Sequence, residues 1–142
     1  MSLSKPNKPY YVKTSKVQYW FKRINKKVFN NSVAEPRNII LQEKYKWEWG
    51  WCITSGNESS FWWDLHMLQK YPSFTLFLEV LAHEMVHAWE YTSYPDSYIT
   101  SKVSHGKEFF SWKEPLGEIG IHLSKYAYEQ PKSDPTKIQE SI

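Results

Sequence analysis

The chain has 142 residues, which is enough for a single domain with one hydrophobic core. It contains no run of about 18 apolar residues that could span a membrane, and no basic segment followed by an apolar leader. We therefore expect an intracellular, cytoplasmic protein. The sequence leaves the oligomeric state open, and a monomer is the expected form. The single cysteine, Cys52, cannot form an intrachain disulfide, and we expect it to be a small core residue rather than a nucleophile.

The net charge of +3 is unevenly distributed along the chain. Through Lys46 there are eleven basic residues and two acidic ones, a net charge of +9, whereas the remainder carries −6. A basic half indicates attraction to a polyanion such as nucleic acid. The alternative is a solvated helix face beside a lysine-rich tail.

The first predicted element is a helix from Ser15 to Phe29, after a polar segment, residues 1–14, that we expect to be flexible. Apolar residues recur there at helical spacing: Val17, Trp20, Phe21, Ile24 and Val28. Basic side chains surround this stripe, and four of them are candidate nucleic-acid contacts: Lys22, Arg23, Lys26 and Lys27.

Three short strands follow, at residues 38–42, 46–53 and 61–67. In the second strand Trp47, Trp49 and Trp51 alternate and share one face. Ser55-Gly56-Asn57 predicts a turn, so the last two strands should form a hairpin. We expect a small antiparallel sheet of about three strands, packed against the next helix.

The next helix carries the strongest chemical signal. Residues 74–91 contain neither Gly nor Pro and predict one continuous helix. His83 and His87 lie about 40° apart around its axis and about 6 Å along it, so both imidazoles can bind one metal ion. Glu84 could take a proton from a water on that metal, as in zinc hydrolases. Two ordinary histidines on an amphipathic helix are the alternative, which the intervening Glu84 disfavours.

A catalytic zinc takes three protein ligands and keeps its fourth position for water. His105 is the best candidate for the third ligand, since a long polar loop can return the chain to the helix. Ser104 is a natural N-cap, which would place His105 on the first turn of a helix over residues 104–114. Carboxylates are the alternatives, first Glu108 and then Glu118.

The remaining sequence is less informative. Pro115 should end or kink the helix that begins at Ser104. Residues 121–128 fit either a strand or an irregular aromatic segment. Residues 129–142 are expected to be a flexible tail, so the predicted domain spans residues 15–128. His66 is interpreted as a surface or cleft residue.

The two histidine motifs resemble those of the SprT-like metalloprotease family, which includes the Spartan-type DNA–protein crosslink proteases. Residues 83–88, His-Glu-Met-Val-His-Ala, resemble its HExxHA motif, and residues 105–109, His-Gly-Lys-Glu-Phe, resemble its HGxxF motif. Residues 24–30 are similar to its first helix and Asn–Phe signature. Residues 50–52 and 61–65 resemble its short sheet. The resemblance covers roughly residues 15–120.

Two departures from the family pattern stand out. A single cysteine cannot form the zinc ribbon that follows this domain in many relatives. Pro115 also interrupts the helix after His105 earlier than the family pattern implies.

The resemblance implies a minimal zincin-like α+β domain with Zn²⁺ on His83, His87 and His105 and with Glu84 as catalytic base. The implied activity is zinc-dependent hydrolysis of protein substrates, including DNA-bound or DNA-crosslinked proteins. Exposed tryptophans near the cleft could stack with unpaired bases, so single-stranded DNA is the expected nucleic-acid partner. One alternative is a peptidase for one dedicated protein partner without DNA. Another is a non-catalytic, zinc-stabilised adaptor. The oxyanion-stabilising residue stays open among four tyrosines: Tyr91, Tyr94, Tyr98 and Tyr126.

Overall fold

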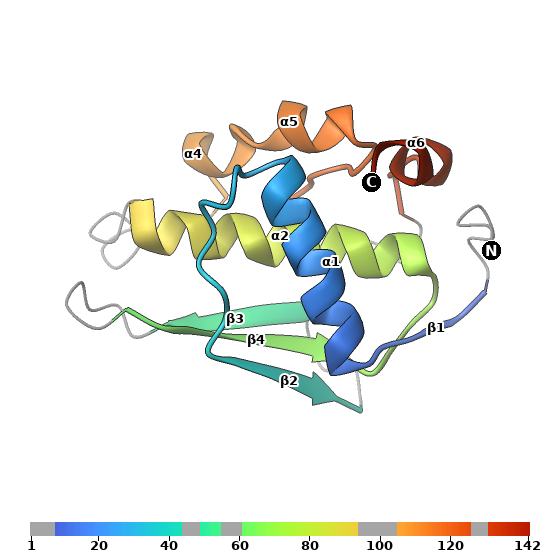
Figure 1. Ribbon diagram of the computed structural model, residues 1–142, viewed down its shortest axis with the longest axis horizontal. Coiled ribbons are helices and arrows are strands. Elements are labelled where there is room, and N and C mark those ends of the chain that lie inside the picture. The colour runs from blue at the N-terminus through green and yellow to red at the C-terminus, as the bar shows by residue number, and fades with distance from the viewer. Residues whose placement is uncertain (1–7, 44–48, 55–60, 94–104, 126–130) are drawn as a thin grey trace.

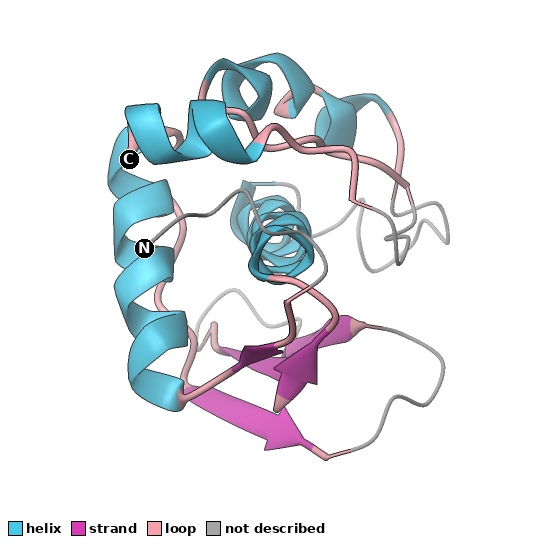
Figure 2. Ribbon diagram, turned by 90° about the vertical axis from the view of Figure 1, so that its right-hand side faces the viewer, coloured by secondary structure: helices cyan, strands magenta, loops and turns pink. Residues whose placement is uncertain are grey.

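The computed structural model describes residues 8–43, 49–54, 61–93, 105–125 and 131–142, which form a mixed α+β domain (Figure 1). Helix α2 (Phe74–Ser93) runs through the middle of the molecule. The three-stranded sheet lies on one side of α2, and the shorter C-terminal helices lie on the other (Figure 2). The α+β class expected from the sequence is confirmed.

Because it has a layer on each side, α2 is buried around most of its circumference. Leu78, Ala82 and Met85, on the side away from the histidines, are fully buried. His87 and Glu84 are also buried, at 6% exposure each. The chemically interesting face of α2 is therefore covered by protein and not turned to open solvent.

Helix α1 (Thr14–Lys27) crosses α2 and forms one wall of the core (Figure 1). Three of its apolar residues are almost fully buried: Val17, Phe21 and Ile24. Asn30 and Asn31 turn the chain with positive φ angles of 52° and 63°. The Asn25 side chain fixes the turn by bonding both the N–H and the carbonyl of Val33, at 3.1 and 2.9 Å.

The sheet contains β2 (Asn38–Gln42), β4 (Trp63–Leu68) and β3 (Gly50–Thr54), in that spatial order. The predicted antiparallel pairing of β3 with β4 is confirmed, with Cys52 opposite Leu65. The pairing of β2 with β4 is parallel, with Ile39 opposite Leu65, so the wholly antiparallel sheet is wrong. β4 is the most buried of the three strands, and its central place satisfies its backbone groups on both sides.

The described part of the N-terminal segment differs from the flexible segment expected there. Strand β1 (Tyr10–Tyr11) pairs antiparallel with β5 (Lys70–Tyr71). Val12 is 7% exposed, and its N–H donates to the carbonyl of Gln69 at 2.8 Å. An apolar side chain after a tyrosine pair thus ties this segment to the core.

The helix expected over residues 104–114 is broken in two. The structure has α4 (Lys107–Phe110) and α5 (Lys113–Glu118). Pro115 explains the break, because it lacks the N–H that would bond the carbonyl of Ser111 and its ring would clash with that carbonyl. Helix α4 also begins later than expected, after Gly106 as N-cap, so His105 precedes it instead of lying on its first turn. Ser104 lies outside the described residues.

The chain after α5 packs against α2 without forming a strand. Ile121 and Leu123 are buried, at 0% and 1% exposure, so residues 121–124 are an irregular apolar segment. The remainder of the ambiguous stretch, from residue 126, lies outside the described residues.

The expected flexible tail is wrong for residues 131–142. Helix α6 (Pro135–Ser141) begins with Asp134, whose carboxylate accepts from the N–H groups of Thr136 and Lys137. Ile138 anchors α6 in the core at 1% exposure. An Asp N-cap followed by Pro at the first helical position is a helix-start signal that the sequence carried.

Several predicted features lie outside the described residues. These are residues 1–7, Trp47 in the second predicted strand, the Ser55-Gly56-Asn57 turn, and the loop over residues 94–104. Within the described part of the chain, no helix is long and apolar enough to cross a membrane.

Candidate metal centre

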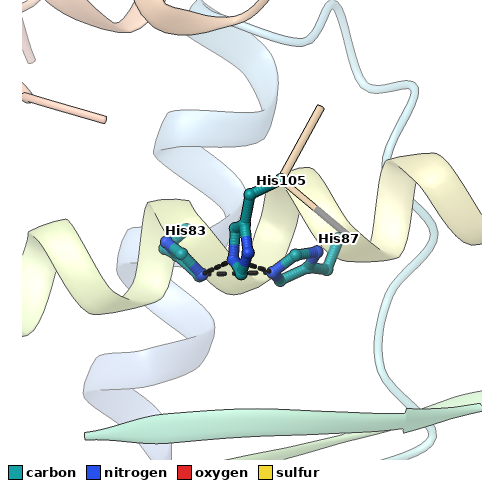
Figure 3. Close-up of side chains that lie close together, drawn as sticks. All are labelled: His83, His87 and His105. Carbon is teal, nitrogen blue, oxygen red and sulfur yellow. Dashed lines mark hydrogen bonds between the residues drawn. The ribbon is translucent and has the colours of Figure 1, made fainter. Parts of the chain in front are cut away.

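Three histidine side chains converge at one point beside α2 (Figure 3). His83 and His87 extend from α2, and His105 reaches them from the residues just before α4. Their Nε2 atoms form a triangle: 3.1 Å from His83 to His87, and 3.2 Å from His105 to each of the others. Among the residues that the structure describes, this is the group that could hold a metal ion.

The triangle fits a tetrahedral metal. Zinc bound to imidazoles at about 2.0–2.1 Å needs ligand nitrogens about 3.3 Å apart, close to the observed separations. Three histidine ligands leave the fourth tetrahedral position for water. The donor set therefore suits a zinc ion with one exchangeable position.

Hydrogen bonds at the opposite ring nitrogens orient two of these imidazoles. The Nδ1 of His83 lies 3.0 Å from the carbonyl oxygen of Ser124, which can only accept, so Nδ1 carries the proton. The Nδ1 of His87 lies 3.2 Å from Oε1 of Glu90, which accepts in the same way when ionised. Both Nε2 atoms then present lone pairs to each other at 3.1 Å, an arrangement that a cation stabilises.

Burial keeps these histidines neutral. It lowers the pKa of His83 to about 3, with further lowering by His87 and His105. Burial, followed by the charge of His105, lowers the pKa of His87 to about 3. The pKa of His105 is lowered as well, chiefly by burial. Because metal binds the neutral imidazole, this environment preserves the ligating form of all three side chains near neutral pH.

Glu84 lies between the two α2 histidines and faces β3. Its Oε1 is 3.0 Å from the sulfur of Cys52, which can donate its S–H to a carboxylate. Cys52 is only half-buried, and the sequence interpretation as a simple core residue missed this contact. The only sign of this contact in the sequence is that Cys52 lies in a strand expected to pack against the helix that carries His83.

Glu90 is a second residue that the sequence reasoning left without a function. It lies one turn beyond His87, which is the (i, i+3) spacing that lets two helical side chains meet. Burial, the largest effect, raises the pKa of Glu90 to about 7; His105 opposes this shift and Glu108 adds to it. The sequence carries a signal for this contact, because an acidic residue follows His87 by three residues on the same predicted helix.

The alternative ligands do not join the cluster. Glu108 and Glu118 are exposed, and neither belongs to the metal-capable group. His66 instead stacks on Trp51, with ring centroids 4.6 Å apart. His122 lies on the segment after α5 and does not belong to the metal-capable group; its backbone N–H donates to the hydroxyl oxygen of Ser133.

The basic residues of α1 lie on a different element from the histidines. Lys22, Lys26 and Lys27 are exposed. Arg23 is half-buried, and its Nη2 donates to the carbonyl oxygen of Ile142 at 2.5 Å. Of the four tyrosines left open for the oxyanion, Tyr91 is buried and the other three lie outside the described residues.

A family model described as the SprT-like family matches residues 17–132, which is most of the chain. The chain belongs to the SprT-like family. The match includes the three converging histidines and Glu84, and it ends just before Ser133 and α6. No curated protein sequence matches the chain. Membership in the SprT-like family, together with the histidine cluster, indicates a metallopeptidase-like domain.

Proposed function

We propose that this SprT-like protein is a zinc-dependent endopeptidase. The observation that carries the proposal is the triangle of three histidine Nε2 atoms, together with the buried carboxylate of Glu84 on α2, the helix that bears two of the histidines. His83, His87 and His105 would hold the zinc. When bound there, zinc supplies Lewis-acid chemistry, lowering the pKa of a bound water toward about 7 and polarising the scissile carbonyl.

Glu84 is the proposed general base. It would take a proton from the attacking water and pass that proton to the leaving amine. The contact with Cys52 restrains its carboxylate, while Ser124 and Glu90 restrain the two ligands on either side of it in sequence. Each reacting or ligating group on α2 therefore has its own partner, as preorganised sites require.

The ligand count favours a catalytic zinc over a purely structural one. A structural site normally fills four positions with protein ligands and needs no base. In the described part of the chain the cluster has three ligands, and Glu84 stands beside them. If the protein were a zinc-stabilised adaptor, the buried Glu84 carboxylate beside the zinc ligands would be unexplained.

Strand β3 is the proposed docking edge for the substrate chain. Among the strands that the structure describes, β4 is paired on both sides and β3 is the edge strand of this hairpin. β3 also packs closely on α2: a Cβ added to Gly50 would lie 2.8 Å from Cγ1 of Val80, and Cys52 contacts Glu84. A peptide added to β3 would use backbone hydrogen bonds, which read no particular sequence.

We further propose that the substrates include proteins bound or crosslinked to DNA. This proposal is supported by the exposed lysines of α1, a helix whose sequence has no acidic residue. Exposed lysines attract phosphates by releasing counterions. A peptidase for one dedicated protein partner remains the rival, and the two differ in whether DNA matters.

The test uses the purified protein and an unfolded protein substrate such as casein. We expect about one equivalent of zinc, and hydrolysis that stops on chelation and returns when Zn²⁺ is restored. The assay is repeated with single-stranded and double-stranded DNA. Stimulation of casein hydrolysis by DNA supports the DNA-linked protease, and casein hydrolysis indifferent to DNA supports a peptidase in which DNA plays no part. Bound zinc without casein hydrolysis in any arm would overturn the general endopeptidase and leave the dedicated-partner peptidase and the adaptor.

A further inference from the structure

We propose that the C-terminal segment positions the zinc ligand His83, through Ser133 and Glu79. Three hydrogen bonds connect His83 to Ser124, His122 to Ser133, and Ser133 to Glu79, so the connection begins and ends on α2 as a ring. Helix α6 holds Ser133 in its place in this ring. The inference rests on the proposed zinc site and does not require that the protein be a peptidase. Ser133 and α6 lie beyond the SprT-like match, so the family model does not include this support.

The ring meets the metal centre at Ser124. Its carbonyl accepts the Nδ1 proton of His83 at 3.0 Å, which fixes both the tautomer and the rotation of the imidazole. The position of this carbonyl is set by residues 121–124, which belong to no helix or strand. Such a segment needs partners elsewhere for its backbone.

Ser133 supplies one of those partners and connects the segment to α2. Its Oγ accepts the backbone N–H of His122 at 2.8 Å. Its own backbone N–H donates to Oε2 of Glu79 at 2.6 Å. Glu79 lies on α2 four residues before His83, so the ring returns to α2 about one turn from the ligand.

Helix α6 keeps Ser133 in place. The N–H of Asp134 donates to the carbonyl of Gly120 at 2.8 Å, beside the buried Ile138. Gly120 has a φ of 90°, and a Cβ there would lie 2.8 Å from both the Asp134 oxygen and the Ile138 nitrogen. The close approach of α6 therefore requires glycine at this position.

Glu79 has no place in the proposed chemistry, yet it is buried at 5% exposure. A buried carboxylate is costly unless it is hydrogen-bonded, and the bond to Ser133 supplies that partner. Loss of either residue should let residues 121–124 shift. A shift of about 1 Å would lengthen the bond to His83 beyond the hydrogen-bonding range.

The test measures metal binding in the full-length protein. Zinc affinity is obtained by competition with a chromogenic chelator, and ligand geometry from the visible absorption of the Co²⁺-loaded protein. We expect Ser133→Ala and Glu79→Ala to weaken zinc binding about five- to tenfold, near the lower limit of changes around metal ligands. Both variants should also alter the Co²⁺ spectrum.

Conservative variants separate positioning from general stability. Ser133→Thr keeps the hydroxyl acceptor and Glu79→Gln keeps a carbonyl acceptor, so both should restore most of the affinity. Thr136→Ala, at an exposed position on α6, is the matched control and should behave as the unmodified protein. Thermal melting of the metal-free variants shows which of them are folded.

Two results would overturn the inference. One is folded Ser133→Ala with unchanged zinc affinity and an unchanged Co²⁺ spectrum. The other is a lower melting temperature in the alanine variants with no change in either metal measurement, since that is a structural contribution alone. If Glu79→Ala does not fold, Ser133→Ala and Ser133→Thr carry the comparison. Absence of zinc binding by the unmodified protein would instead overturn the proposed function.

Discussion

The sulfur of Cys52 on β3 lies 3.0 Å from Oε1 of Glu84 on α2. A second contact, 3.6 Å long, joins the same sulfur to the backbone carbonyl of Glu84. The thiol thus approaches both the carboxylate and the main chain of the proposed general base. A residue of the sheet thus restrains the carboxylate that is proposed to act on α2.

Replacing Cys52 tests that relationship. Cys52→Ala should lower kcat about fivefold, since one hydrogen bond is worth about 1 kcal/mol, while zinc content stays unchanged. Cys52→Ser offers a hydroxyl donor and should recover part of the loss. The measurement is steady-state hydrolysis of a peptide with zinc stoichiometry determined in parallel. An alanine variant with full kcat would show that Glu84 needs no such partner.

Glu84→Gln should retain the fold and the zinc but lose hydrolysis. The carboxylate is assigned to proton transfer, and general-base catalysis typically contributes about 10² to 10⁴ in rate. Hydrolysis and bound zinc are measured on the same preparation. An active Glu84→Gln enzyme would contradict the mechanism.

His105→Ala should weaken zinc binding by more than about a hundredfold. Changes in the residues around metal ligands already cost about 10- to 100-fold, and this change removes a ligand. His66→Ala and His122→Ala are matched controls, because neither residue belongs to the metal-capable group. Affinity is measured by chelator competition. Full retention of zinc by the His105 variant would identify a different third ligand.

Asp64 should make stability depend on acid pH. Hydrogen bonds from Arg37, at 2.7 and 3.1 Å, lower its pKa below the ordinary value of 3.8. The unfolded chain then binds the proton more readily, so the stabilisation is complete above about pH 4 and is lost as pH falls through the lowered folded-state pKa. Urea unfolding of the metal-free protein and of Asp64→Asn should differ more at pH 7 than at pH 2.5. An equal difference at both values would refute this linkage.

The exposed lysines of α1 should give weak, sequence-independent DNA binding that falls as salt rises. Replacing Lys22, Lys26 and Lys27 by Gln should reduce binding and flatten its salt dependence without changing zinc content. Arg23 is left intact because it contacts Ile142. The measurement is fluorescence anisotropy with a labelled single strand at two salt concentrations.

The control for that experiment is the unmodified protein at low salt. If it does not bind there, the basic half is only a solvated face, and the dedicated-partner peptidase becomes the better proposal. Binding that persists unchanged in the lysine variant would instead locate the DNA contacts on another surface.

The sequence by itself determined the metal cluster and the helix that bears most of it. Helical periodicity and the four-residue spacing of His83 and His87 are local properties, which hold wherever the helix packs. His105 followed from its motif. The N-cap of α6 at Asp134, followed by Pro135, is equally local and predicts a helix start within the segment expected to be a flexible tail.

The tertiary structure alone decided the contacts between distant parts of the chain. Cys52 meets Glu84 across 32 residues, His83 meets Ser124 across 41, and Glu79 meets Ser133 across 54. The parallel pairing of β2 with β4 has the same origin, since it depends on which strand takes the buried centre of the sheet. No periodicity or spacing encodes such pairs, because their partners are selected by the packing of the whole core.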